Sequence, residues 1–327
     1  MSWCTRNRDL FVPQLSGAWH RPWPQRPWPC VIRDGDDFVP SVSGAWHRTW
    51  PEGARLKLCM FSPRGSNLQR GWPGRIEGDR VIQLAAQTLQ SYFTGGGKAR
   101  EHAEFPLEEV DLRPPVLKPP SVRDFYAFEQ HVKTARAARG LEMPEEWYRI
   151  PVFYFSNPNA MYGPEDDIPY PDGSNELDYE LEVGAVIGAD QQIGGFTVMN
   201  DWSARDVQRE EMRVGLGPSK GKDFATSIGP VVVTPDEFDG TSGTMVARVN
   251  GEERSRGNLA DMHHSWEAIR SHAARNTELC PGDILGSGTV GTGCILELGD
   301  GRWLKPGDVV ELEVEGIGIL RNTIGPR

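Results

Sequence analysis

The stretch that most constrains the fold covers residues 177–188 and reads LDYELEVGAVIG. Its first half alternates polar and apolar side chains, and its second half is continuously apolar. Alternation at period two is typical of a β-strand, so Glu180 and Glu182 point to the same face, which Asp178 shares. The apolar half predicts that this strand enters a hydrophobic core.

Two neighbouring carboxylates at the entrance to a core repel each other and lose hydration, at a cost on the order of several kcal/mol if nothing compensates them. A hard divalent cation, which prefers oxygen ligands, would remove this cost. The alternative is an edge strand whose polar face is simply hydrated. These residues alone leave both interpretations open.

Composition excludes some classes of partner. The chain has 327 residues, a net charge of −11 and no long basic run, which argues against nucleic acid or an anionic membrane surface as a partner. No apolar stretch is long enough to span a bilayer, and the first residues contain no apolar signal-peptide region, so we expect a cytoplasmic protein. The length predicts one large domain with a smaller one, or two ordinary domains. An anionic substrate would need local cations or a metal.

Residues 1–55 differ from the rest of the chain. They are rich in tryptophan and proline, and the segment FVPQLSGAWHRPWP at 11–24 recurs as FVPSVSGAWHRTWP at 38–51. Prolines at this density exclude helix interiors and central strands. The segment is either an arm that docks on a partner subunit or a poorly ordered extension. We favour the extension, and therefore do not expect His20 or His47 to bind a metal.

Residues 56–117 predict a small α+β domain without catalytic residues. A strand is expected at 56–61, a hairpin at 75–82 with its turn at Gly78 and Asp79, and a short amphipathic helix at 84–93. The paired prolines that follow predict a stiff linker at 108–120.

Residues 118–327 are expected to form the larger domain. Strands separated by turns dominate, including one at 295–298, so the predicted fold class is α+β, mostly β, with a mixed sheet that is rolled or barrel-like. Asp124 and His131 share a face if one helix covers both. Asp201 ends an apolar strand before a polar helix, the usual place of a helix N-cap. Lys222 lies in a glycine-rich loop that lacks the P-loop pattern.

Five motifs occur in a fixed order along this region. They are DFYAFEQH at 124–131, LDYELE at 177–182, MNDWSARDVQ at 199–208, GKDF at 221–224 and GTVG at 288–291. Each is modest alone, but the ordered set is specific. Together they resemble the fumarylacetoacetate hydrolase family over residues 56–327.

This resemblance implies a mixed β-roll, a Mg²⁺ (or Ca²⁺ or Mn²⁺) site, a homodimer and a small anionic 2-oxo or 1,3-diketo acid as substrate, as in aromatic amino acid catabolism. The metal ligands that it implies are Asp124, Glu180, Glu182 and Asp201. The catalytic residues are His131, Glu297, which orients His131, and Lys222, with Thr226 near the metal. The substrate contacts are Tyr126, Tyr154, Arg205, Gln208 and Thr289.

The sequence departs from fumarylacetoacetases in three respects. Met212 replaces an expected substrate tyrosine, Arg139 is an off-register candidate for an expected arginine, and the N-terminal domain is short. These departures concern the substrate more than the reaction. We therefore expect a metal-dependent hydrolase that cleaves a C–C bond of a diketo acid with water activated by His131 and Glu297. The alternatives are an isomerase or decarboxylase of 2-oxo or hydroxy-dienedioate intermediates, and a non-catalytic ligand-binding member.

Overall fold

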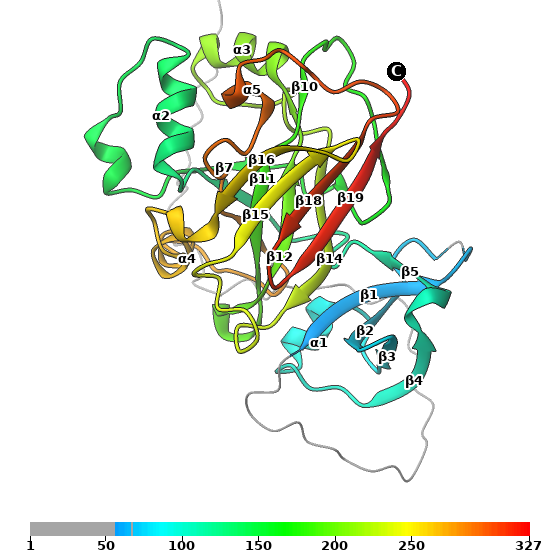
Figure 1. Cartoon of the computed structure of the whole chain (residues 1–327). Coiled ribbons are helices and arrows are strands. Elements are labelled where there is room, and N and C mark those ends of the chain that lie inside the picture. Colours follow the sequence, from blue (N-terminus) through cyan, green and yellow to red (C-terminus); the bar gives the residue numbers. More distant parts are fainter. Residues whose placement is uncertain (1–55, 67) are drawn as a thin grey trace, which may run out of the picture. The chain divides into compact units, whose positions relative to one another are not determined.

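The computed structural model describes residues 56–66 and 68–327. The expectations for residues 1–55, including the repeat, His20 and His47, lie outside the described residues. Within the described part, strands dominate and form three sheets, with few and short helices (Figure 1). The predicted mixed, mostly β architecture is confirmed, and the sheets do not close into a barrel.

The largest sheet has 12 strands, and a ladder of two short strands flanks it. The strands of the large sheet are β1 (Lys57–Pro63), β2 (Trp72–Glu77), β3 (Arg80–Leu84), β4 (Glu101–Pro106), β5 (Val110–Arg113), β6 (Val122–Phe125), β7 (Phe153–Ser156), β8 (Met161–Tyr162), β11 (Leu181–Ile187), β12 (Ile193–Asp201), β14 (Thr226–Val233) and β17 (Ile284–Gly286). The small ladder pairs β10 (Leu177–Asp178) with β13 (Ser203–Ala204).

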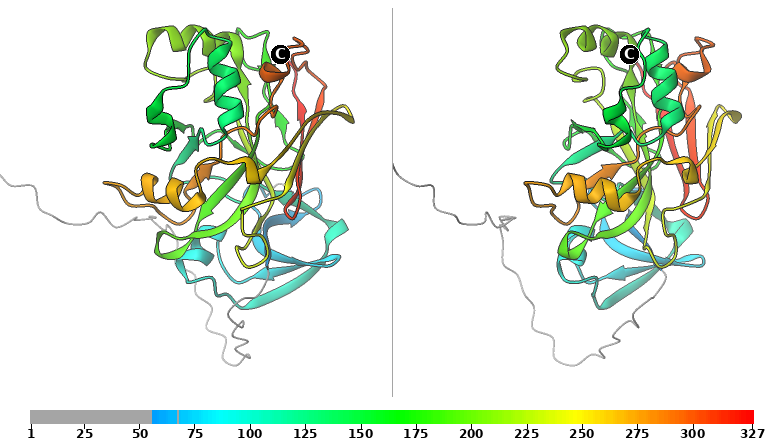
Figure 2. Two further views of the ribbon diagram at one scale, coloured as in Figure 1. Left: turned by 60° about the vertical axis from the view of Figure 1, so that its left-hand side comes forward. Right: turned by 90° about the vertical axis from the view of Figure 1, so that its left-hand side faces the viewer.

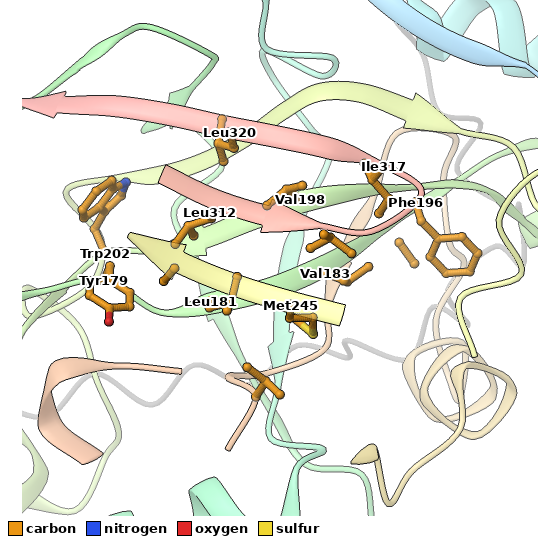
Figure 3. Close-up of a cluster of buried hydrophobic side chains, with 14 of the residues drawn as sticks. Tyr179, Leu181, Val183, Phe196, Val198, Trp202, Met245, Leu312, Ile317 and Leu320 are labelled. Atoms are coloured by element: carbon orange, nitrogen blue, oxygen red, sulfur yellow. The ribbon is translucent and has the colours of Figure 1, made fainter. Parts of the chain in front are cut away.

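A five-stranded sheet packs against the large one. Its strands are β9 (Asp167–Ile168), β15 (Thr244–Val249), β16 (Glu252–Asn258), β18 (Val309–Val314) and β19 (Gly318–Ile324). Figure 3 shows the core between the sheets: Leu181, Val183 and Val198 of the large sheet face Met245, Leu312 and Leu320 of the smaller one. All six side chains are buried, as expected for two sheets whose inward positions alternate along each strand.

The α-helices are α1 (Leu89–Thr94), α2 (Glu129–Ala137), α3 (Arg205–Val214), α4 (Trp266–Ala273) and α5 (Ile295–Leu298). Single 3₁₀ turns occur at Leu107–Glu109, Glu145–Tyr148, Ala189–Gln191 and Leu259–Asp261. Helices α2, α3 and α5 gather at one end of the sheets (Figures 1 and 2). None of the helices in the described residues is long and apolar enough to cross a membrane.

The stretch 177–188 becomes an interior strand. β11 is antiparallel to β12 on one side and to β17 on the other, and every one of its residues is buried. A hydrated edge strand is therefore excluded. Glu180 lies in the short gap between β10 and β11, and Glu182 is the second residue of β11.

The strand, hairpin and helix predicted within residues 56–93 form as β1, β2 with β3, and α1, but the predicted linker is not a linker. Residues 110–113 form β5, which pairs with β1 from Met60↔Arg113 to Pro63↔Val110. β1 in turn pairs with β14. The prolines that suggested a stiff spacer begin directly after β5 ends, so they do not interrupt its backbone hydrogen bonds.

Two local predictions near the site are wrong. Asp124 and His131 do not share a helix, because Asp124 lies in β6, where it pairs with Gly286 and Tyr154, and α2 begins only at Glu129. Glu297 does not lie in a strand, because residues 295–298 form the single turn α5. A four-residue segment such as ILEL at 295–298 fits either structure, and the surrounding contacts decide which one forms.

Candidate metal centre and catalytic residues

Four buried carboxylates converge where neighbouring strands of the large sheet end. Asp124 comes from β6, Glu182 from β11 and Asp201 from the end of β12. Carboxylate oxygens of Asp124, Glu180 and Glu182 all lie within 4.8 Å of one another. The sheet order β12-β11-β17-β6 brings these residues together although they are far apart in the sequence.

Gly286 makes the close approach possible. It lies in β17 between β11 and β6, where a Cβ atom would sit 2.4 Å from Asp124 Oδ1 and 3.1 Å from Glu182 Oε2. Any larger residue would push the two carboxylates apart. Sequence reasoning missed Gly286 because one glycine before a glycine-rich loop carries no distinctive signal.

The carboxylate cluster fits a divalent cation. One oxygen of each of Asp124, Glu182 and Asp201 is buried and makes no hydrogen bond. Buried carboxylate oxygens without partners are costly unless a cation approaches them. Oxygen donors of this kind suit Mg²⁺, Ca²⁺ or Mn²⁺ rather than a soft metal. The predicted ligands Asp124, Glu180, Glu182 and Asp201 are thus brought together, and Asp201 is not a helix N-cap, because α3 begins at Arg205 after Ala204.

The carboxylates differ in their charged neighbours. Lys222 Nζ donates to both Glu180 and Asp201, and Arg205 Nη2 donates to Glu180 Oε1 at 2.7 Å. Burial raises the pKa of Glu180, but the charges of Arg205 and Lys222 outweigh it and hold the pKa well below the usual range. The Lys222 ammonium stays charged, because its carboxylate partners raise its pKa against the effect of burial.

Asp124 and Glu182 have no such cation in hydrogen-bond contact. Burial and the nearby charge of Asp201 raise the pKa of Asp124 well above its ordinary value. Burial and the charge of Asp124 do the same to the pKa of Glu182. Both groups therefore resist ionisation until positive charge is brought to them.

His131 and Glu297 form a pair beside this cluster. His131, on α2, hydrogen-bonds through Nδ1 to Glu297 Oε2 of α5 at 2.8 Å. Its other ring nitrogen, Nε2, lies 4.0 Å from Glu180 Oε1. A carboxylate at Nδ1 fixes the tautomer in which Nε2 is free to accept a proton. Cys294, which sequence reasoning did not single out, places its Sγ 3.6 Å from Glu297 Oε2.

The predicted substrate contacts surround the same centre. Tyr154 donates its hydroxyl to Asp201 Oδ2, and Thr289 Oγ1 donates to Glu182 Oε1 at 3.2 Å. The Tyr126 ring lies edge-on to the His131 ring, with centroids 5.4 Å apart. Burial raises the pKa of Tyr126 to about 12, so it remains a hydrogen-bond donor at neutral pH.

Arg205 and Gln208, predicted as substrate contacts, hydrogen-bond to protein side chains. The Arg205 guanidinium donates to Asp178, Glu180 and Gln208, so Nε and both terminal nitrogens have protein partners. Thr226 pairs with Asp201 across β14 and β12, and its Oγ1 lies 3.3 Å from Ser156 Oγ. Thr226 therefore lies close to the carboxylate cluster because its backbone pairs with that of Asp201.

Comparisons with known proteins identify the family of this chain. The model of the fumarylacetoacetate (FAA) hydrolase C-terminal domain matches residues 121–325. A 2,4-didehydro-3-deoxy-L-rhamnonate hydrolase of Sphingomonas sp. is 29% identical over 288 residues, which cover 82% of this chain and 96% of that protein. The mitochondrial oxaloacetate tautomerase FAHD2A of Homo sapiens is 31% identical over 263 residues, 76% of this chain and 77% of its own length.

A solved structure gives the same result for the fold. The 5-carboxymethyl-2-hydroxymuconate delta-isomerase of Mycobacterium smegmatis superposes with a TM-score of 0.64 and 26% identity, over 84% of this chain and all of that one. The relatives thus include a hydrolase, a tautomerase and an isomerase. From the family model, the ordered motifs and the shared fold, this chain belongs to the fumarylacetoacetate hydrolase family.

Proposed function

We propose that this protein is a metal-dependent hydrolase that cleaves a C–C bond in a small 1,3-diketo or 2-oxo acid. The observation that carries the proposal is the His131–Glu297 pair, whose free nitrogen faces the carboxylate cluster 4.0 Å from Glu180. A proton acceptor oriented in this way beside a cation site suits the activation of water.

The residues divide the work of hydrolysis. Asp124, Glu180, Glu182 and Asp201 would hold a divalent cation, which when bound supplies Lewis acidity to the substrate's oxygens. His131 Nε2 takes a proton from water while its Nδ1–H donates to Glu297, which stabilises the resulting imidazolium. The hydroxyl of that water adds to the distal acyl carbon.

When the C–C bond breaks, its electron pair remains on the 2-oxo fragment as an enolate. Lys222 adds a fixed positive charge next to Glu180 and Asp201, where it favours negative charge on this fragment. A proton returned from His131 would complete the keto product and restore the base. The products are a carboxylic acid and a 2-oxo acid.

Proton transfer without cleavage is the second candidate. It is supported by the tautomerase and isomerase among the relatives. The same base would then move a proton between carbon and oxygen of an enolisable 2-oxo acid, and water would not be consumed. Glu297 would stabilise the imidazolium of His131 in either reaction, so the His131–Glu297 pair argues against decarboxylation, which needs no such base, and the products separate hydrolysis from proton transfer.

An absorbance screen separates the candidates. Purified protein with and without Mg²⁺ is tested against acylpyruvates, fumarylacetoacetate, oxaloacetate and hydroxy-dienedioates. Hydrolysis is expected to remove the diketo-enol band and to produce two acids, measured by chromatography. Loss of the band with an isomeric product of unchanged mass would favour the tautomerase or isomerase, and no Mg²⁺-dependent change with any of these acids would contradict both.

A further inference from the structure

Asp178 is a buried carboxylate to which the mechanism above gives no role. It follows the pattern of Glu180 and Glu182 in the sequence, but it is fully buried and turns to other partners. Its Oδ1 accepts from the backbone N–H of Ile295 at 2.8 Å, and its Oδ2 accepts from the N–H of Leu296 at 3.0 Å. Its Oδ2 also accepts from Arg205 Nε at 2.8 Å.

The two backbone donors belong to the first turn of α5. A helix leaves its first N–H groups without intrahelical partners, and a side chain usually satisfies them. Cys294, at the N-cap position, makes no such hydrogen bond, so Asp178 does so from more than 100 positions earlier in the chain. Without its carboxylate these buried donors would have no partner here, and α5 would lose its polar attachment to the small ladder.

α5 carries Glu297, and a continuous chain of contacts starts and ends at Asp178. Asp178 holds Arg205, Arg205 Nη2 binds Glu180, and Glu180 Oε1 lies 4.0 Å from His131 Nε2. His131 Nδ1 binds Glu297 on α5, and the N–H groups of α5 return to Asp178. Asp178 therefore links α5, which carries Glu297, to Glu180 of the carboxylate cluster through Arg205.

We propose that Asp178 is a positioning residue that docks α5 and thereby holds Glu297 against His131. This inference rests on the proposed function for its kinetic consequences, but its structural consequence does not depend on any substrate. Because Asp178 acts through Glu297, its loss should matter only while Glu297 is present.

Asp178→Asn tests this role with the shape of the side chain preserved. An amide offers one acceptor oxygen and turns two N–H groups toward donors, so it cannot satisfy both α5 and Arg205. A small displacement of the base pair should lower kcat by about 10- to 100-fold with little change in KM. Asp172→Asn, at an exposed carboxylate in the loop before β10, is the control and should leave kcat unchanged.

A double-mutant cycle with Glu297→Gln identifies the route of the effect. If Asp178 acts through Glu297, the Asp178→Asn, Glu297→Gln double variant should be no slower than Glu297→Gln alone. Losses that multiply, or a kcat of Asp178→Asn within twofold of wild type, would overturn the proposal.

Hydrogen exchange provides the readout that needs no substrate. Amides of residues 295 and 296 should exchange at least about tenfold faster in Asp178→Asn than in wild type or Asp172→Asn. Unchanged exchange overturns the proposal even if no substrate in the screen is turned over. Faster exchange in a protein without hydrolase activity would retain the positioning role and reject only the function proposed above.

A second pair of variants protects the test against misfolding of Asp178→Asn. Ile295→Pro deletes one donor to Asp178 but leaves the carboxylate and Arg205 intact. Proline is well tolerated at the first helical position, and Cys294 already has the extended backbone (φ −148°, ψ 161°) that a residue before proline adopts. Ile295→Val keeps the N–H with a comparable loss of side-chain volume. The proline variant should have the lower kcat, and equal values would overturn the proposal.

Discussion

The carboxylate cluster and the His131–Glu297 pair are neighbours built in different ways. Asp124, Glu182 and Asp201 lie in strands of one sheet, and each of these strands is paired on both sides. His131 and Glu297 lie on α2 and α5, and α5 is only four residues long. The sheet fixes the cluster by many backbone hydrogen bonds, whereas the base pair depends on a few side-chain contacts. The cation site should therefore survive changes that disable the base.

The two sets of groups also differ in how their charge is balanced. Each member of the base pair is the other's partner, whereas Asp124 and Glu182 have raised pKa values and unsatisfied oxygens. In the first set, His131 and Glu297 bind each other, although Oε1 of Glu297 has no hydrogen-bond partner among the described residues. The second is complete only with a cation.

The largest expected effect is that of His131→Gln. The glutamine removes the base while keeping a polar side chain, so kcat should fall by about 10²–10⁴-fold. Mg²⁺ affinity, measured by calorimetry, should stay within a few-fold of wild type because no carboxylate of the cluster changes. A parallel loss of Mg²⁺ binding would break the distinction between the two regions.

Lys222→Met is expected to have the next largest effect. It removes the fixed charge that favours the enolate, so kcat should fall by about 10²–10³-fold. Since the ammonium repels a cation, Mg²⁺ should bind at least as tightly as in wild type. Weaker binding in calorimetry would mean that Lys222 supports the site by holding Glu180 and Asp201 in place.

Gly286→Ala should affect the cluster and spare the base pair. The new methyl group would press on Asp124 Oδ1 and Glu182 Oε2, so the Mg²⁺ affinity should fall by about tenfold or more. At saturating Mg²⁺ kcat should return to within a few-fold of wild type. If kcat stays low at saturating Mg²⁺, a change in the carboxylate cluster also disturbs the His131–Glu297 pair, which would contradict their independence.

The smallest expected effect is a pH dependence of thermal stability. The folded-state pKa values of Asp124 and Glu182 lie above their unfolded values. Their contribution to stability is therefore present below about pH 4 and is lost as the pH rises through the folded-state pKa values. Bound Mg²⁺ offsets that loss, so the increase in Tm that it causes, about a few degrees, should be larger at pH 8 than at pH 5. A pH-independent increase, measured by calorimetric scans, would contradict these shifts.

The sequence predicted features that depend on local patterns. The alternation at 177–188 identified the strand that carries Glu182 and follows directly on Glu180. Gly78 with Asp79 marked a hairpin turn between β2 and β3. The order of five motifs identified the family before any geometry was known. Local signals also misled, since Asp124 begins a run of residues that fits a helix as well as the end of a strand.

The remaining features depend on contacts between distant residues. Asp178 looks like a third member of the Glu180–Glu182 face, but its partners lie 27 and 117 positions away in the chain. The hydrogen bonds of the Arg205 guanidinium to Asp178, Glu180 and Gln208 likewise follow from tertiary structure. No pattern within a window of the sequence contains this information.

The pairing of β1 with β14 bears on how this chain can be divided. The family model begins at residue 121, which suggests a catalytic fragment that could be produced alone. β14, however, lies between β1 and β12, and β1 pairs with its last two residues, Val232 and Val233. Cutting away residues 56–117 would uncover the apolar end of β14 at Val232 and Val233, and unpaired apolar strand edges template aggregation. A truncated protein should therefore precipitate during expression, because the N-terminal strands cover this end of β14.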